Sequence, residues 1–236
     1  MPICDHARRF TAALLFTLVA SAAVPASAGP LAIAPTTVEI APGRNSAVIE
    51  ILNDSDAPVD LQFRPFAWSQ KDGRDELTPT EDLAVSPAIA TVAPHARQIF
   101  RVLRTHCDTG AGEHGFRLKL NEIPRGGAQI AVNLEFSIPV FETVAGAKPA
   151  LSWTPAPGGV ELANTGVRRI KFARLALVGP DGARHELDAA RSTYLLGGTR
   201  RRIALPEGVR PVFGTRLVGV ADSGPVDTPA AVAVPR

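Results

Sequence analysis

The chain has 236 residues, of which 45% are hydrophobic and 20% charged, a balance that is typical of folded globular proteins and argues against disorder. Its 25 Lys and Arg residues nearly equal its 23 Asp and Glu residues, so the chain lacks the basic excess of a protein that binds nucleic acid through phosphate contacts. The 21 Pro and 20 Gly residues favour short strands joined by turns over long helices.

Residues 1–28 have the pattern of a secretory signal peptide. Arg8 and Arg9 precede an apolar run over residues 10–20, and residues 26–28 (Ala-Ser-Ala) form a small-residue cleavage site. The alternative, an uncleaved membrane anchor, is less favoured because the run is shorter than the roughly 20 residues that a spanning helix needs. We therefore expect an exported, soluble protein.

The two cysteines do not predict a disulfide. Cys4 lies within the signal peptide, and Cys107 is then the single remaining thiol, so no intramolecular disulfide can form. We expect Cys107 to be buried or poorly reactive. The domains must then be stabilised by core packing alone.

Residues 29–144 are predicted to form a first domain of short strands. Apolar segments separated by turn residues cover residues 31–40, 45–52, 59–68, 96–103, 115–122 and 129–141. Several alternate with period two, most clearly at Phe116, Leu118 and Leu120. Short alternating segments at this spacing predict an antiparallel β-sandwich.

Residues 81–93 do not follow this pattern. Thr80 could cap a short helix there, but Pro87 would interrupt it. A short helix and an irregular loop are both left open.

A second sandwich is predicted over residues 149–222, after a linker at residues 142–149 that loses the alternation. In both domains an apolar strand leads to an asparagine, Asn53 or Asn164, and a second alternating strand follows. Asparagine suits such a turn because its side chain can bond to the nearby backbone. The echo indicates either two related sandwiches or a coincidence of a common motif. The tail, residues 223–236, is predicted to be frayed.

Catalytic motifs are scarce. The sequence contains no G-x-S-x-G, P-loop, G-x-G-x-x-G or H-E-x-x-H pattern. A polar cluster could form a metal site or a Cys–His nucleophile pair from His106, Cys107, Asp108 and His114. Neighbouring side chains of an extended chain point to opposite faces, and the spacing matches no zinc pattern. We therefore predict no enzyme activity, no metal and no cofactor.

The basic run at residues 200–202 is the other charged feature of the sequence. It could contact a phosphate or a membrane surface. A solvated turn between strands is the favoured interpretation.

The segment over residues 129–141 is an unusually long alternating strand, of about ten residues against the usual five or six. Its even positions are apolar: Ile130, Val132, Leu134, Phe136 and Ile138. Pro139 has no N–H to donate, which predicts a sheet edge near that residue. A long apolar edge is normally avoided because it promotes aggregation. The five side chains either face the core of their own domain or bind another polypeptide.

Five fragments carry a family resemblance, at residues 31–38 (Leu-x-Ile-x-Pro-Thr-x-Val), 113–124 (with Glu-Ile-Pro at its end), 137–141, 162–166 and 192–197. In this order they resemble the periplasmic chaperones of the chaperone–usher pilus pathway, the PapD-like family, with the archaic branch favoured by residues 137–141. The resemblance covers nearly the whole chain after the signal peptide.

The resemblance implies an all-β fold of two immunoglobulin-like sandwiches set at an angle, with a cleft between them. It implies a periplasmic chaperone that lends one strand to a pilin subunit, a form of strand addition, and delivers the subunit to an outer-membrane usher. The lent side chains would be Ile130, Val132, Leu134, Phe136 and Ile138. Self-association of the free chaperone through the same strand is possible in this scheme.

One departure from the family concerns the subunit's C-terminal carboxylate, which the better-known branch binds with an Arg on the first strand and a Lys on the lent strand. Thr37 and Pro139 occupy those positions here. Arg117, Lys119 and Arg104 are the candidate replacements. Arg117 is the first choice because a guanidinium fork matches carboxylate geometry, and the alternative is that these are solvated surface charges.

Two other functions compete with the chaperone. The first is a structural or adhesive pilus protein, against which the lack of an obvious N-terminal donor extension counts. The second is a secreted hydrolase or metal-binding protein that uses His106, Cys107 and His114.

Overall fold

The computed structural model of the chain describes residues 31–106, 112–124, 134–187 and 193–231. The regular structure in these ranges consists of β-strands, as predicted. Within them no helix is present that could cross a membrane. Cys107, with its predicted burial, lies outside the described residues.

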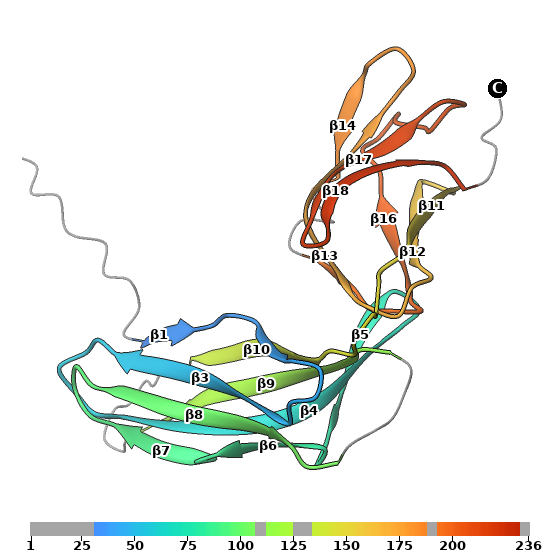
Figure 1. Cartoon of the computed structure of the whole chain (residues 1–236). Coiled ribbons are helices and arrows are strands. Elements are labelled where there is room, and N and C mark those ends of the chain that lie inside the picture. Colours follow the sequence, from blue (N-terminus) through green and yellow to red (C-terminus); the bar gives the residue numbers. More distant parts are fainter. Residues whose placement is uncertain (1–30, 107–111, 125–133, 188–192, 232–236) are drawn as a thin grey trace, which may run out of the picture.

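The first domain is a sandwich of two sheets (Figure 1). One sheet has the order β1 (Leu31–Ala34), β3 (Ser46–Asn53), β8 (Arg97–Arg104) and β6 (Leu83–Ser86). The other has the order β2 (Val38–Ile40), β10 (Glu135–Glu142), β9 (His114–Ile123), β4 (Val59–Lys71) and β5 (Arg74–Pro79), with β7 (Ile89–Val92) also paired to β4. The pairing is antiparallel except between β10 and β2, which run parallel.

Alternation determines which side chains fill this sandwich. Phe116, Leu118 and Leu120 of β9 are buried in the core between the sheets, while the residues between them are only partly buried. The predicted period-two pattern is thus the core face of the strand. Residues 81–93 form neither a helix nor an irregular loop, because β6 and β7 lie there as two short strands on either side of Pro87.

The second domain is a smaller sandwich. One sheet has the order β11 (Leu151–Ala156), β12 (Gly159–Asn164) and β16 (Arg200–Ala204). The other has the order β14 (Arg184–Glu186), β13 (Ile170–Val178), β17 (Arg216–Ala221) and β18 (Gly224–Pro229), with β15 (Tyr194–Leu195) also paired to β13. The predicted all-β fold of two immunoglobulin-like sandwiches is therefore confirmed.

Two expectations for this domain are wrong. Residues 223–229 are not frayed, because β18 pairs with β17 and places Val226 in the domain core. The second sandwich therefore extends beyond residue 222. Residues 200–202 do not form a turn, since they begin β16, which pairs with β12 and ends with the buried Ile203.

The similar segments around Asn53 and Asn164 form the same hydrogen-bond motif in both domains. Asn53 and Asn164 are both buried, at 0% and 1% exposure. The Nδ2 group of Asn53 donates to the carbonyls of Ala57, Val92 and Ala93. That of Asn164 donates to the carbonyls of Arg168, Leu195 and Leu196. In each domain the Oδ1 atom accepts from the backbone N–H two residues later. The two turns are the same structural device in two related sandwiches.

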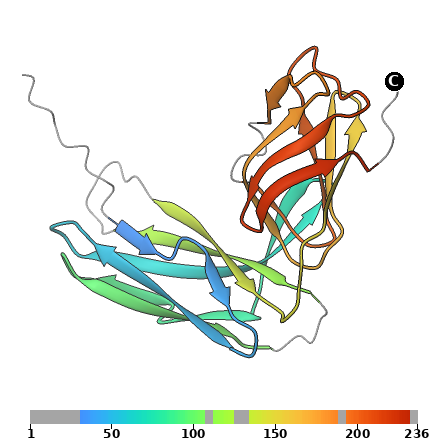
Figure 2. The same cartoon turned by 45° about the horizontal axis from the view of Figure 1, so that its top comes forward.

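The domains meet at an angle and contact each other directly (Figures 1 and 2). A small apolar cluster spans the junction, with Trp68 and Phe141 from the first domain and Tyr194 and Leu196 from the second. The side chain of Gln70 adds hydrogen bonds to the backbone of Tyr194 and Leu196. A cavity of about 660 Å³ opens between the domains beside this cluster.

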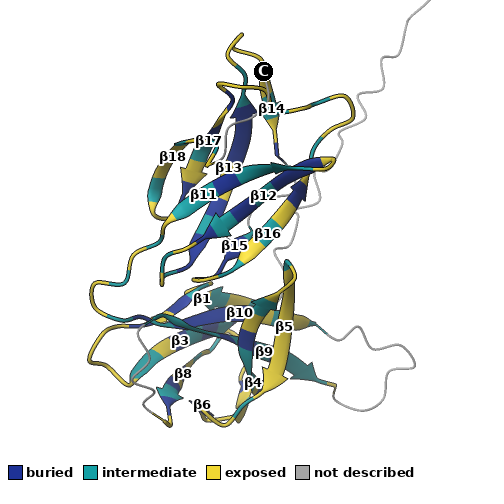
Figure 3. Ribbon diagram, turned by 90° about the vertical axis from the view of Figure 1, so that its right-hand side faces the viewer, coloured by how far each residue is buried: buried dark blue, intermediate teal, exposed yellow. Residues whose placement is uncertain are grey.

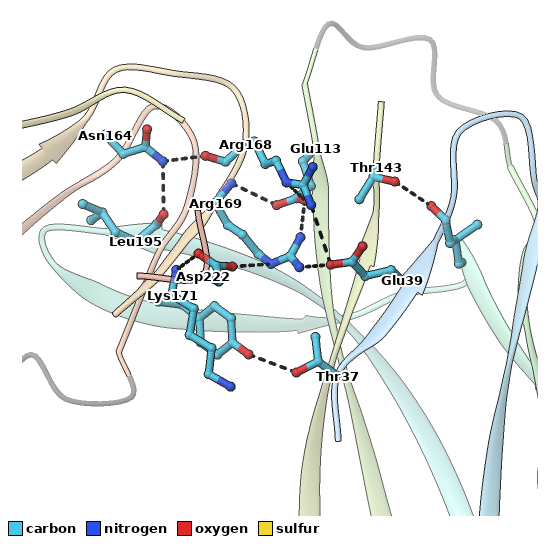
Figure 4. Close-up of polar contacts among 12 residues, drawn as sticks. Thr37, Glu39, Glu113, Thr143, Asn164, Arg168, Arg169, Lys171, Leu195 and Asp222 are labelled. Atoms are coloured by element: carbon cyan, nitrogen blue, oxygen red, sulfur yellow. Dashed lines mark hydrogen bonds and ion pairs between the residues drawn. The ribbon is translucent and has the colours of Figure 1, made fainter. Parts of the chain in front are cut away.

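An ion-pair network at the junction lies against this apolar cluster (Figure 4). Arg169 of the second domain is 4% exposed and contacts the carboxylates of Glu113 and Glu39 in the first domain. Its guanidinium also lies 3.8 Å from the ring centroid of Phe141. Burial raises the pKa of Glu113, and Arg169 is the strongest of the influences that lower it again.

Candidate functional site

Strand β10 lies at an incompletely covered sheet edge. On one side β9 pairs with it over its whole length, from Glu135 opposite Asn121 to Glu142 opposite His114. On the other side β2 pairs with residues 140–142 alone. Over residues 135–139 no described strand covers this edge, as Pro139 predicts.

The candidate side chains of this strand differ in burial. Ile138 is 4% exposed and belongs to the core of its own domain, whereas Phe136 is half-buried and packs against that core. Leu134 is also half-buried, and its carbonyl accepts a bond from the N–H of Glu122. Ile130 and Val132 lie outside the described residues. Leu134 and Phe136 share the inward face of Ile138 but are only partly covered, so they are the partly accessible apolar groups of the described edge.

The opposite face of the strand carries a charged group around Glu135. Lys119 lies 3.0 Å from its carboxylate, Arg64 lies 3.6 Å away, and the side chain of Asn121 donates to it at 2.9 Å. The hydrogen bonds from Asn121 and Lys119 lower the pKa of Glu135. Lys119, one of the candidate anchors, therefore already has a carboxylate partner.

Arg104, another candidate, is committed to the interior. Its guanidinium is 3% exposed and lies 2.8 Å from the carboxylate of Glu142. It also donates to the carbonyl of Asp82 and lies 4.8 Å from the ring centroid of Phe116. The charge of Arg104 is therefore compensated by Glu142 within its own domain.

Arg117 occupies a different position, directly opposite Pro139 at the end of the uncovered edge. Its guanidinium carbon lies 3.8 Å from the ring centroid of Trp68 and 5.6 Å from that of Tyr194. Burial lowers its pKa. Its side chain donates a long bond of 3.4 Å to the carbonyl of Ser137, and the carboxylate of Asp75 partly offsets the effect of burial on the pKa of Arg117.

Thr37 and Pro139, at the two positions where the resemblance implies charged anchors, carry no charge. The hydroxyl of Thr37 lies 3.2 Å from the hydroxyl of Tyr194 in the second domain (Figure 4). Pro139 is buried beside the start of β2. Arg117, on the strand next to Pro139, is the nearest of the three candidates in register.

The sequence patterns do not identify Tyr194 or Trp68 as part of this region. Tyr194 lies 157 positions from its hydroxyl partner Thr37. No local pattern links residues that far apart. The single tyrosine of the chain and the aromatic residue at the end of an alternating strand were the only available hints.

The predicted absence of a metal site was argued from the cluster at residues 106–114. His106 is exposed and lies 3.4 Å from a carboxylate oxygen of Asp82. Cys107 and Asp108 lie outside the described residues, and His114 lines the cavity between the domains. The described part of the chain brings no three candidate metal ligands together.

Comparison with known proteins gives a consistent family assignment. Residues 30–143 match the model of the pili and flagellar-assembly chaperone family, PapD N-terminal domain. A search of curated protein sequences finds no match.

Solved structures share the two-domain fold. A chain of the CsuC–CsuE chaperone–tip adhesion subunit pre-assembly complex, from the archaic chaperone–usher Csu pili of Acinetobacter baumannii, is 18% identical with a TM-score of 0.69, covering 84% of this chain and 97% of that one. The E. coli chaperone DraB is 18% identical with a TM-score of 0.63, covering 86% and 98%. A chain of the Salmonella enterica SafA pilin in complex with the SafB chaperone is 15% identical with a TM-score of 0.61, covering 84% and 94%. At these identities the likeness establishes the fold.

Proposed function

We propose that this chain, which belongs through residues 30–143 to the PapD-like family of pilus-assembly chaperones, binds a pilus subunit along the uncovered edge of β10. The subunit would gain from β10 a strand that its own sheet lacks, which is the strand-addition mode of recognition. The alternative of a structural or adhesive pilus protein is not favoured, because the matched family consists of chaperones.

The observation that carries this proposal is the edge over residues 135–139, where β10 has a neighbour on one side only. Unpaired N–H and C=O groups of such an edge accept a further strand without regard to its sequence. The alternate side chains add apolar contacts. Because Ile138 is already in the core, the binding groups reduce to Leu134, Phe136 and the predicted Ile130 and Val132.

The burial of these four side chains gives an estimate of the free energy of binding. Full burial of a large apolar side chain is favourable by about 1.5–3 kcal/mol, so four give about 6–12 kcal/mol before the costs of ordering and association. This gross value is an upper bound, since Leu134 and Phe136 are half-buried in the free chain. It is of the size needed to hold a subunit whose core is incomplete.

The uncovered edge also favours one direction for the bound strand. β2 runs parallel to β10 and occupies the edge from Val140 onward, so a bound strand must end before Val38. If that strand runs parallel to β10, its C-terminal carboxylate lies at the end where Arg117 stands opposite Pro139. An antiparallel strand would place a positive amino terminus or a continuing chain there. The cation at Arg117 therefore favours the parallel direction and an anchored carboxylate.

The cellular setting of this proposal is the periplasm. The signal peptide predicted at residues 1–28 would export the chain, and the delivery partner would be an outer-membrane usher. No nucleotide would be required, because a later subunit could displace the lent strand by the same pairing. Self-association through the uncovered edge would protect the free chaperone.

Co-expression with a pilin subunit tests the proposal. The wild-type chain should purify as a stable 1:1 complex, and the double variant Leu134→Asp with Phe136→Asp should lose it, because two charges would enter the apolar contact. The control is Val48→Asp with Ile99→Asp, at side chains that are 52% and 59% exposed on the other sheet. Both variants should keep the β-sheet circular dichroism of the wild type. A complex that survives the first double variant refutes the proposal.

A further inference from the structure

Strand β11 forms one edge of the three-stranded sheet of the second domain. It pairs with β12 on one side, and no described strand pairs with its other side. The N–H of Thr165 donates to the carbonyl of Ala150, and bonded pairs alternate along an antiparallel ladder. The backbone groups of Trp153 and Pro155 therefore point away from β12. An edge of this kind accepts a further strand and favours association unless something covers it.

The chain that follows β18 already touches this edge. The N–H of Ala231 donates to the carbonyl of Trp153 at 2.9 Å, and the indole N–H of Trp153 donates to the carbonyl of Thr228 at 2.9 Å. Trp153 is buried in the domain core, Ala230 packs against the same core, and Ala231 is exposed. Because opposite residues of paired strands share a face, it is Ala230 that stands opposite Trp153.

The position of this bond indicates that the two segments run parallel. With Ala230 opposite Trp153, the next residue, Ala231, bonds to the carbonyl of Trp153 and not to that of its own opposite neighbour. Such a slanted bond is the pattern of parallel strands, whereas antiparallel pairs bond directly across. Two residues further, the same pattern would join the N–H of Ala233 to the carbonyl of Pro155. Pro155 has no N–H, so the edge leaves no donor without a partner there.

The side-chain alternation of β18 also continues into the segment that follows. In β18 the even positions face the core, where Val226 is buried, and the odd positions are exposed. Ala230 keeps this alternation, since it packs against the core. The next residues are Val232, Ala233 and Val234, and the same period places the two valines on the core side and the alanine outside.

A cavity of about 570 Å³ lies at the end of β11. The turn between β11 and β12 and the loop after β16 line it, with apolar side chains that include those of Pro155, Ala156, Leu205, Pro206, Val209 and Pro211. Leu205 also packs against the domain core. Parallel strands rise by equal steps, so a strand that continues from Ala231 places Val232 opposite Pro155, a residue that lines the cavity.

We propose that residues 232–234 form a short strand parallel to β11, with the two valines in this cavity and the N–H of Ala233 bonded to the carbonyl of Pro155. The occupant is the chain's own segment because it begins directly after the bond that holds Ala231 to the edge, so no second molecule has to be ordered. The inference does not depend on the proposed function. It implies that the second domain covers its own sheet edge, while the first domain leaves β10 open.

Amide hydrogen exchange of the ¹⁵N-labelled full chain tests the pairing. Alternate N–H groups of a strand face opposite neighbours, so one amide of the segment should be protected and its two neighbours should not. The amide of Ala233 should exchange at least about tenfold more slowly than in an unstructured peptide. The amides of Val232 and Val234 should exchange close to the peptide rate.

Urea unfolding, followed by the NMR signals of the second domain, tests the burial. Val232→Asp places a charge in the cavity, and Ala233→Asp is the matched control because it places the same charge outside. A chain that stops after Ala231 removes the segment. Val232→Asp and the shortened chain should raise the unfolding equilibrium constant at least about tenfold, as expected when a buried valine is lost. Ala233→Asp should change it by about twofold at most.

Other outcomes overturn the inference. Exchange of the Ala233 amide at the peptide rate shows that the segment does not pair with β11. Equal effects of Val232→Asp and Ala233→Asp on unfolding show that the cavity does not take the valine. A wild-type dimer in sedimentation that the shortened chain does not form shows that the segment binds a second copy instead of its own domain.

Discussion

At the scale of single residues, the buried asparagines show how a small polar group holds each sandwich together. Asn53 and Asn164 each join the end of one strand to a turn and to a segment from elsewhere in the domain. Three of their carbonyl partners, those of Val92, Leu195 and Leu196, are buried. Each asparagine therefore stabilises its domain mainly by leaving no buried polar group without a partner.

Replacement of Asn164 by alanine should lower the free energy of unfolding of the second domain by about 3 kcal/mol or more. The substitution leaves the buried carbonyls of Leu195 and Leu196 without this donor, and each unsatisfied buried polar group costs about 1–3 kcal/mol. Urea unfolding measures the change. Asn121→Ala is the control, since the side chain of Asn121 bonds only to exposed groups, and it should change stability by no more than about 0.5 kcal/mol. Equal effects of the two substitutions would contradict this account of Asn164.

At the scale of single elements, β10 performs two tasks in sequence along one strand. Its C-terminal half, from Ile138 to Phe141, is buried in the first-domain core and in the junction. Its N-terminal half carries the accessible Phe136 beside the charged group around Glu135. Stability and binding are therefore separable along the strand.

This separation predicts that one alanine substitution mainly lowers stability and another mainly weakens subunit binding. Ile138→Ala should cost about 2–5 kcal/mol of stability, as expected for a large side chain removed from a core. Phe136→Ala should cost clearly less in stability, because the ring is only half-buried, but should weaken the subunit complex more. Chemical unfolding of the free chain and subunit dissociation rates give the two measurements, and a larger stability loss from Phe136→Ala would contradict the division.

Some strands could be predicted from the sequence pattern and others could not. Period-two alternation predicted the strands whose one face lies in a core, such as β9, and Pro139 predicted the edge of β10. This pattern did not predict β18, where prolines, a glycine and polar residues surround the buried Val226. It also did not predict β16, where three arginines precede the single core residue Ile203. Arg117 could be identified from its strand, whereas Tyr194 could not, because its contact with Thr37 depends on how the two domains pack.

At the scale of the whole molecule, the two domains are joined by both apolar and ionic contacts. The aromatic cluster around Trp68 and Tyr194 and the ion-pair network of Arg169 meet at the ring of Phe141. The long hairpin of β4 and β5 adds a third contact, with Asp75 3.0 Å from Arg201. Strand β5 is otherwise exposed along its length, as Figure 3 shows.

Removal of Arg169 should weaken this junction. Arg169→Met leaves the Glu113 carboxylate, which is 3% exposed, without its main partner, and breaking a buried pair in this way costs about 3–5 kcal/mol. The pKa of Glu113 should rise further, because Arg169 is the strongest influence that lowers it. Small-angle scattering should show a wider distribution of domain arrangements, and a ¹³C titration of the carboxyl group reports the pKa.

The carboxyl group of Glu113 also determines how the stability of the folded protein changes with pH. A carboxyl whose pKa is raised on folding binds its proton more tightly in the folded state, so its contribution to stability falls as the pH rises from about 4.5 to the raised value. In the Arg169→Met variant this decline should extend to higher pH than in the wild type. Arg168→Met is the control, since its nitrogens lie 3.8 and 3.9 Å from the same acids, and it should leave the profile nearly unchanged.

The place where β2 closes the edge of β10 has one further consequence. A strand bound beside residues 135–139 cannot slide past Val38, so the position of its last residue sets which residue of β10 each earlier residue pairs with. Adding one residue at that end would turn all of its apolar groups to the opposite face, while adding two would restore the facing but shift each group by two residues along β10. The chaperone would thereby measure the length of a subunit's final strand and distinguish odd from even.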